Sequence, residues 1–163
     1  PQLLDRFGMS VEVRTVRDPE QRVQAVGQRG QFDSDPVSFL TQFQGQQKGL
    51  QEKVVAAQER LGSVQMDPDL RLKISEVCGQ LEVDGLRGDI VTNRAARALA
   101  AFEGRAEVND DDVARVMACC LRHRLRKDPL EQVDSGDRVI KVFCQVFGLN
   151  PDDRDAFQLA LAA

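Results

Sequence analysis

The chain has 163 residues, of which 42% are hydrophobic, and a formal net charge of −4 at pH 7, which fits one domain or one domain with part of another. The acidic balance argues against a dedicated nucleic-acid-binding protein, because such proteins carry a basic excess that meets phosphate. No apolar run approaches the roughly 20 residues that cross a bilayer, and the four cysteines and one histidine lack the spacing of a zinc site.

The first predicted element is a β-strand between residues 9 and 16. Met9, Val11 and Val13 alternate with polar residues, which is the pattern of a strand with one buried face. A lone strand leaves its backbone N–H and C=O groups unpaired, so its partner strands are expected upstream of Pro1. The chain is then the end of an α/β core followed by a helical domain. A strand contributed by another chain is the alternative.

Helix starts are indicated by prolines that follow an aspartate or asparagine. Such a side chain at the N-cap accepts a hydrogen bond from the first turn of a helix, and a proline at the first helical position has no N–H to leave unpaired. The five pairs are Asp18-Pro19, Asp35-Pro36, Asp67-Pro68, Asp128-Pro129 and Asn150-Pro151. Most of the chain after residue 18 is therefore expected to be helical.

Apolar residues at helical spacing predict helices with one buried face, which pack into a bundle. Asn109 is the expected N-cap of one of these helices. A weaker stripe in the glutamine-rich stretch consists of Leu50, Val54, Ala57 and Leu61. The four stronger stripes are Leu70, Ile74, Val77, Cys78 and Leu81; Ile90, Val91, Ala95, Ala98, Leu99 and Phe102; Val113, Val116, Met117, Cys120, Leu121 and Leu125; and Val139, Val142, Phe143, Val146 and Phe147.

Three stretches of the sequence resemble one branch of the AAA+ ATPases. The opening PQLLDRFGMSVEV resembles the end of the ATPase core in the chelatase, MoxR and MCM branch. GLRGDIVTNRAARALAAFEGRAEVNDDDV resembles the sensor-2 helix of that branch and the helix after it. CLRHRLRKDPLE, together with VCGQLEVDGLRGDIVTNRAA, is similar to the small, I-type ATPase subunits of magnesium chelatase. The resemblance reaches about Gly148, and the tail from Leu149 is not assigned.

The resemblance implies a mainly α fold, in which a lid-type AAA+ helical bundle follows one strand left over from the truncated α/β ATPase core. The expected parts are residues 1–33 at the end of the core, a helical connector at 34–66, the sensor-2 (lid) domain at 67–148 and a terminal tail or helix at 149–163. No GxxxxGK[ST] phosphate-binding loop occurs in the sequence. This chain alone is therefore expected not to hydrolyse ATP.

The resemblance also implies an activity, which is ATP-driven insertion of Mg2+ into protoporphyrin IX during chlorophyll synthesis. The implied assembly is a hexameric ring of this subunit working with the D-type and H-type chelatase subunits. ATP with Mg2+ is the implied cofactor, bound mainly by upstream sequence. The expected compartment is the chloroplast stroma, with a cyanobacterial cytoplasm as the alternative. Two other functions stay open: a helical protein-interaction module, and the lid of a MoxR-like or MCM-like AAA+ protein.

Two arginines are the candidate catalytic residues. By resemblance Arg6 is an arginine finger given in trans, where a rigid guanidinium fork meets the charge on the γ-phosphate. Without the resemblance, Arg6 would be a solvated arginine paired with Asp5. Arg87 lies between Gly85 and Gly88, just before a predicted helix, where backbone N–H groups can approach a phosphate. By resemblance Arg87 is sensor 2 and contacts the γ-phosphate of ATP, and the alternative is a loop arginine that caps a turn.

Cysteines and a basic run supply the remaining candidates. By resemblance Cys78 and Cys120, on different predicted helices, form a disulfide controlled by thioredoxin, whereas the alternative is two buried free thiols. Cys119 is a competing partner, and Cys144 is expected to be structural. The basic run at residues 122–127 ends a helix, where cations complement the helix dipole, or contacts an acidic patch on a partner subunit. Its histidine has no nucleophile or carboxylate partner in the sequence, so no role is assigned to it.

Overall fold

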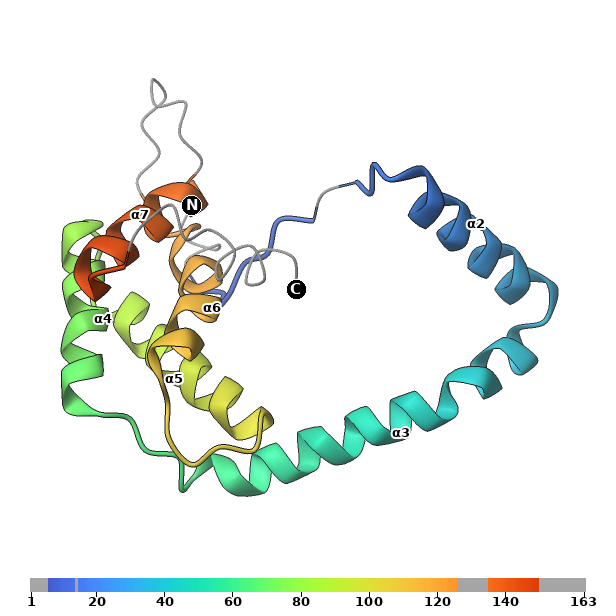
Figure 1. The fold of residues 1–163 in the computed structure, drawn as a ribbon, viewed down its shortest axis with the longest axis horizontal. Helices are drawn as coiled ribbons and strands as arrows, with labels where there is room; N and C mark the ends of the chain where they lie inside the picture. Colours follow the sequence, from blue (N-terminus) through green and yellow to red (C-terminus); the bar gives the residue numbers. More distant parts are fainter. Residues whose placement is uncertain (1–5, 14, 126–134, 150–163) are drawn as a thin grey trace. The chain divides into compact units, whose positions relative to one another are not determined.

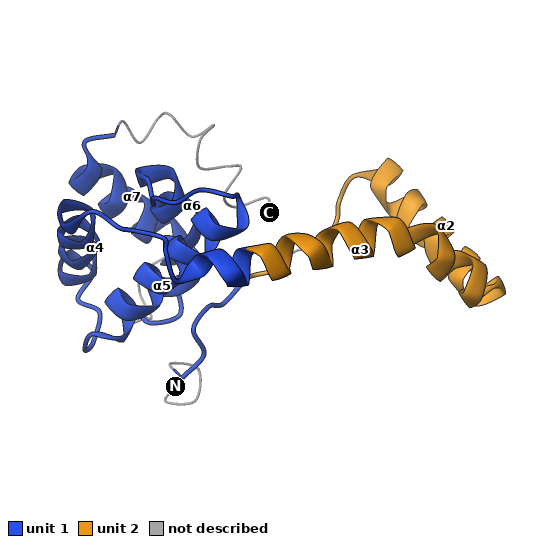
Figure 2. Cartoon of the chain, turned by 90° about the horizontal axis from the view of Figure 1, so that it is seen from below, with its two compact units in different colours: residues 1–11, 57–163 blue, residues 12–56 orange. Residues whose placement is uncertain are grey.

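The computed structural model describes residues 6–13, 15–125 and 135–149. These residues are mainly helical and contain no β-strand, so the prediction of a mainly α chain is confirmed. The chain divides into two compact units, which Figure 2 shows in different colours. The larger unit combines Pro1–Val11 with Ala57–Ala163, and the smaller unit is Glu12–Ala56.

The smaller unit contains two helices whose starts follow from their Asp-Pro sequences. α2 spans Pro19–Ser34 and α3 spans Pro36–Leu61, whose last turns belong to the larger unit. The Asp18 carboxylate accepts the Gln21 N–H at 2.9 Å. In the same way, the Asp35 carboxylate accepts the Ser38 N–H at 3.0 Å. Both predicted caps are therefore confirmed, and each precedes a proline that starts its helix.

These two helices bury little of their surface. Phe32 on α2 meets Phe39 on α3 edge to face, with ring centroids 5.8 Å apart, and Phe39 contacts Phe43 at 5.0 Å. No residue of α2 is buried, and the buried residue of α3 is Ala57, within the larger unit. The predicted stripe around Leu50 does lie on a helix, but most of that stripe is exposed.

In the described part of the larger unit, four further helices form a bundle around one core (Figure 1). Helix α6 packs against α5 and α7, and α4 packs against the same two helices. Their bounds are Pro68–Gln80 for α4, Arg87–Phe102 for α5, Asp110–Leu121 for α6 and Ser135–Phe147 for α7. The apolar stripes predicted for α4, α6 and α7 are buried in this core or packed against it.

Two of the predicted helix caps belong to this bundle. The Asp67 carboxylate accepts the Asp69 N–H at 2.7 Å at the start of α4. At the start of α6, Asn109 and Asp112 exchange side-chain to backbone hydrogen bonds of 2.9 and 3.0 Å, which is a capping box. These predictions are confirmed. The predicted starts at residues 128–129 and 150–151 lie outside the described residues.

The stripe predicted for helix α5 is partly confirmed. Val91, Ala95 and Leu99 pack against the core, whereas Ile90 and Phe102 are 48% and 39% exposed. The buried residues of α5 are small: Gly88, Thr92, Ala96, Ala100 and Ala101. A β-carbon added at Gly88 would lie only 3.0 Å from Leu121 Cδ2. The prediction followed the largest apolar side chains, whereas the closest helix packing falls along the smallest ones.

The predicted strand at residues 9–16 is wrong for the residues that the structure describes there. Residues 9–13, 15 and 16 have no strand structure, and Val13 is 90% exposed. Within the described ranges this stretch has no second strand to pair with, and a strand without a partner leaves its backbone groups unsatisfied. One bond does hold its start, since the Ser10 N–H donates to the Cys119 carbonyl at 2.8 Å.

Candidate functional site

Arg6 is exposed and lies at a turn that is tied to the far end of α6. The Arg124 Nη2 atom donates to the Phe7 carbonyl at 2.7 Å and lies 3.4 Å from the Gly8 carbonyl oxygen. The Ser10 N–H bond to Cys119 adds a second attachment. The backbone immediately after Arg6 is therefore held by hydrogen bonds to residues more than 100 positions later in the sequence.

Arg124 is buried, with only 9% of its surface exposed. Its Nε atom donates to the Cys120 carbonyl at 3.0 Å, so the guanidinium bridges the end of α6 and the Phe7–Gly8 segment. A buried cation is tolerated when its donors are satisfied in this way. The neighbouring His123 places its Nε2 atom 3.2 Å from the same Phe7 carbonyl oxygen.

Sequence reasoning missed the role of this pair. It treated residues 122–127 as a basic helix end and gave His123 no function, because a contact across more than 100 residues leaves no local pattern. One signal was present: Arg124 falls one turn after Cys120 and directly before Leu125, inside an otherwise apolar stripe. A cation at such a position is expected to be buried and to need carbonyl partners.

Arg87 is the first residue of α5 and is exposed. Gly85, with φ of 71°, supplies the left-handed turn before the helix. The N-cap position is Leu86, whose side chain makes no capping hydrogen bond. The capping residue of α5 therefore supplies no side-chain acceptor, unlike those of α2, α4 and α6, and the positive end of the helix dipole can attract an anion.

Gly88 has a different role from the one predicted. It is buried, and an added β-carbon would approach the Leu121 and Val83 side chains to 3.0 Å and Cys78 Sγ to 3.5 Å. The missing side chain therefore allows close helix packing rather than the approach of a phosphate to the backbone.

The two candidate arginines belong to the same compact unit. A β-carbon added at Gly8 would lie 3.7 Å from Val91 Cγ1, and Val91 lies about one turn after Arg87 on α5. The segment that carries Arg6 thus rests against both α5 and the end of α6. Any displacement of this helical pair is expected to move both arginines.

Cys78 and Cys120 are buried, and both are free thiols in the structure. Burial raises the pKa of each thiol to about 12. The Asp89 carboxylate raises the pKa of Cys78 further, and the Thr92 hydroxyl acts in the opposite direction on the pKa of Cys120. A charge on Cys120 is a smaller contribution to the raised pKa of Cys78. Cys144, which was expected to be structural, is buried.

An ion-pair network fixes the loop between α5 and α6. The Asp112 side chain is fully buried and accepts hydrogen bonds from both terminal nitrogens of Arg105, one of them at 2.6 Å. Glu103 bonds Arg105 at 2.6 Å and also pairs with Arg115. Hydrogen bonds from Arg115 and then Arg105 lower the pKa of Glu103. These charges are satisfied by one another, which indicates a structural network rather than a catalytic one.

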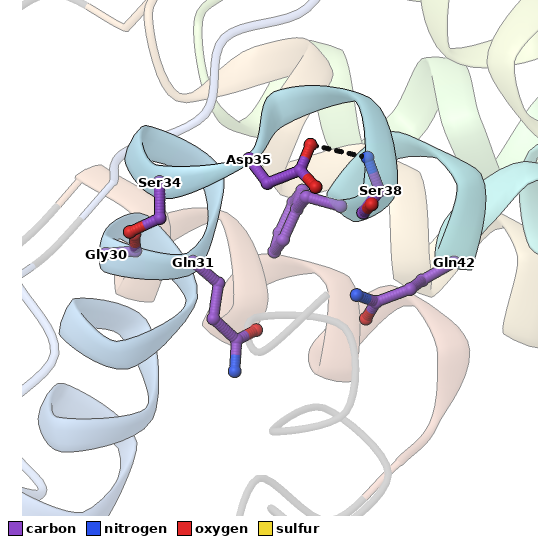
Figure 3. A pocket seen from close by; sticks show the side chains of 7 residues that line it. Gly30, Gln31, Ser34, Asp35, Ser38 and Gln42 are labelled. Carbon is purple, nitrogen blue, oxygen red and sulfur yellow. Dashed lines mark hydrogen bonds between the residues drawn. The ribbon is translucent and has the colours of Figure 1, made fainter.

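A hollow of about 530 Å³ lies in the smaller unit (Figure 3). In Figure 3 the Gln31 and Gln42 side chains extend toward it, while Asp35 turns to Ser38. Hydrogen bonds from Ser38 lower the pKa of Asp35. The residues that line the hollow are Gly30, Gln31, Ser34, Asp35, Ser38, Phe39 and Gln42. They include a carboxylate and no cation, so this hollow is a poor phosphate site.

Among the described residues, no group of three or more histidine, cysteine, aspartate or glutamate side chains is arranged to hold a metal ion. Within the same ranges, no helix combines the length and the apolar character that a membrane crossing requires.

Comparison with known proteins identifies relatives of the whole chain. Residues 71–141 match the AAA lid domain family. The chain is 64% identical over 149 residues to magnesium-chelatase subunit ChlI of Synechocystis, which covers 91% of this chain and 42% of that protein. It is 59% identical to ChlI of Anabaena variabilis, with 97% of this chain and 47% of the relative covered. For ChlI of Cyanophora paradoxa the identity is 59%, with coverages of 90% and 42%. The chain thus spans less than half the length of these relatives.

Proposed function

Because the chain belongs to the family of magnesium-chelatase subunit ChlI and contains a AAA lid domain, we propose that it is the lid-bearing part of the ATPase motor of magnesium chelatase. The proposed reaction of the whole subunit is ATP hydrolysis that drives Mg2+ into protoporphyrin IX. The observation that carries the proposal is the 64% identity to the Synechocystis subunit over 91% of this chain. That identity favours a chelatase lid over a MoxR-like or MCM-like lid.

The residues present suit the phosphate end of ATP. Arg87 is exposed at the first position of α5, after an N-cap residue that offers no side-chain acceptor. A guanidinium at the N-terminal end of a helix can form charge-assisted bonds to a phosphate oxygen. We propose that Arg87 contacts the γ-phosphate of bound ATP as sensor 2, and that Arg6 contacts the γ-phosphate held by a neighbouring subunit. ATP supplies the phosphoryl group, and Mg2+ would be held mainly by parts of the subunit outside this chain.

The proposed partners are further copies of the subunit in a hexameric ring and the D-type and H-type subunits of the chelatase. The relatives come from cyanobacteria such as Synechocystis and from algae such as Cyanophora. We propose the chloroplast stroma as the compartment, with the cyanobacterial cytoplasm as the alternative that the same relatives support.

A chimera tests this function directly. In it, this chain replaces the matching segment of Synechocystis ChlI, which supplies the remainder of the subunit. The chimera is expected to hydrolyse ATP and, with its D-type and H-type partners, to insert Mg2+ into protoporphyrin IX. A folded chimera that does neither would contradict the proposal.

Arg87→Ala in this chimera is expected to lower ATP turnover by about 10- to 100-fold. A hydrogen bond to a charged group contributes about 1.5–3 kcal/mol, and here that contribution would be lost from the transition state. Steady-state ATP hydrolysis is the measurement. Arg71→Ala, which removes an exposed arginine of α4, is the matched control and is expected to leave turnover unchanged. If both variants behave alike, the sensor-2 role is wrong.

We also propose that Cys78 and Cys120 form the thiol pair that exchanges with thioredoxin. Exchange requires a thiolate that another sulfur can reach. In the structure the two thiols are 4% and 0% exposed, and burial holds the pKa of each near 12. Formation or reduction of this disulfide therefore requires the α4–α6 contact to open first.

This requirement predicts slow alkylation of the folded protein. With iodoacetamide at pH 8, Cys78 and Cys120 are expected to react far more slowly than the partly exposed Cys119.

Folding raises the pKa of Cys78 and Cys120 from an ordinary value of 9.0. Because folding favours the protonated thiols, their contribution to the free energy of unfolding is fully present below about pH 9. This contribution is lost as the pH rises toward 12. Peptide mapping of the label against pH, together with unfolding curves, measures both effects.

Two results would count against these ideas. Equal labelling of the three cysteines at pH 8 would show that the pair is not protected. Free Cys78 and Cys120 thiols in fully oxidised, folded protein would end the disulfide proposal.

A further inference from the structure

We propose that Arg124 is a positioning residue for Arg6: it holds the Phe7–Gly8 backbone against the end of α6 and thereby sets where the Arg6 guanidinium can reach. The inference rests on the proposed role of Arg6 as an arginine finger. It adds a lid residue, just after the end of α6, to the machinery of that finger.

The geometry of the Arg124 contacts supports this role. Its Nε atom bonds the Cys120 carbonyl at 3.0 Å, and its Nη2 atom bonds the Phe7 carbonyl at 2.7 Å. A planar guanidinium can bridge two segments at fixed angles, which the single ammonium of a lysine cannot do. Because Arg124 is 9% exposed, water is poorly placed to replace the carbonyl groups, and losing them would leave a buried charge uncompensated.

Polar contacts help to hold the segment after Arg6. The Phe7 and Met9 side chains are 59% and 47% exposed, so they contribute little apolar burial. Its attachments include the Ser10 bond to Cys119, the approach of Gly8 to Val91 and the His123 contact. The buried Arg124 adds its contacts to the Phe7 and Gly8 carbonyls.

Precise placement of a finger matters because it acts on a transferring phosphoryl group. A displacement of about 1 Å in a catalytic group can cost about 100-fold in rate. Arg124 thus links the geometry of the lid to the efficiency of the finger. The same link makes turnover at the neighbouring subunit depend on the lid that carries α5 and α6.

The test uses the chimera of Synechocystis ChlI that carries this chain. Arg124→Met keeps the apolar stem and removes the donors. It is expected to lower kcat for ATP by about 100-fold while the KM for ATP stays within about twofold. The matched control is Arg97→Met. Arg97 also donates to two backbone carbonyls, those of Val64 at 3.1 Å and Leu61 at 3.2 Å, but not to the segment after Arg6. This control is expected to lower the melting temperature and to leave kcat unchanged.

A double variant separates positioning from general damage. In an Arg6→Ala background the finger is already lost, so adding Arg124→Met is expected to change kcat by less than twofold. If the double variant lowers kcat by the product of the two separate reductions, the inference is overturned. An unchanged kcat in Arg124→Met alone would also overturn it. If Arg6→Ala itself retains full turnover, the proposed function of Arg6 fails instead, so the two failures are distinguishable.

A second variant keeps the test decisive if Arg124→Met does not fold. Ser10→Pro removes the N–H that bonds the Cys119 carbonyl and leaves Arg124 intact. It is expected to lower kcat with the KM for ATP unchanged. Hydrogen exchange gives the direct readout: the Ser10 amide, which donates to the Cys119 carbonyl, is expected to exchange faster in Arg124→Met but not in Arg97→Met. Unchanged exchange at this amide, or a rise in KM without a fall in kcat, would overturn the inference.

Discussion

Arg6→Ala is expected to lower ATP turnover of the chimeric ring by about 10³-fold or more, the largest effect among the substitutions considered. An arginine finger stabilises the charge that develops on the transferring phosphoryl group and contributes about 10³–10⁵ in rate. Arg6 is exposed, so its removal is expected to leave folding and nucleotide affinity nearly unchanged. Turnover and ATP binding are therefore to be measured on the same preparation.

Mixed rings test whether the finger acts in trans. Arg6→Ala subunits are combined with subunits whose nucleotide-binding residues are disabled, and neither kind hydrolyses ATP alone. A finger given across the subunit interface is expected to restore part of the turnover in the mixture. Arg6→Lys keeps the charge but lacks the fork, so it is expected to retain most of the loss. Full ATP turnover by the Arg6→Ala ring would contradict a trans finger. So would a mixed ring that does not hydrolyse ATP although some of its subunits keep Arg6.

Asp112→Ala is expected to destabilise the larger unit by about 3–5 kcal/mol, the cost typical of removing one partner of a buried ion pair. The Asp112 side chain is fully buried, pairs with Arg105 and accepts the Asn109 N–H at 3.0 Å. Arg105 is 32% exposed and keeps its bond to Glu103, which places the expected loss near the lower end of this range. Urea unfolding, read as the shift in midpoint at constant slope, measures it.

The neighbouring residue Asp111 provides a matched control for Asp112→Ala. Asp111 precedes Asp112 on the same first turn, but its side chain is 58% exposed. Asp111→Ala is therefore expected to change the free energy of unfolding by less than about 0.5 kcal/mol. Equal midpoints for the two variants would show that the buried pair does not stabilise the loop between α5 and α6.

Local sequence chemistry predicted where helices begin. Asp18, Asp35, Asp67 and Asn109 each cap the helix that was expected to follow them, because capping depends on a side chain and the N–H groups two or three residues later. Long-range packing was not predictable in the same way. Part of the buried face of α5 was missed because the close approach to Leu121 selects Gly88, whereas the larger Ile90 is exposed.

In the candidate site, too, local features were predicted and long-range contacts were missed. Arg87 was placed correctly at a helix start, because glycines and an apolar stripe mark that start locally. The attachment of the Arg6 segment to Arg124 was missed, because it joins residues 117 positions apart. The alternation of Met9, Val11 and Val13 suggested a strand, yet a pattern of side chains cannot reveal whether a partner strand is present.

The apolar cap position of α5 has a consequence for how a nucleotide would be read. Leu86 offers no side-chain acceptor, so the capping residue does not offset the positive end of the α5 dipole. A terminal phosphate beside Arg87 would add negative charge at that end, and hydrolysis would remove it. The difference between a triphosphate and a diphosphate would then reach the lid as a change in the charge that faces the first turn of α5.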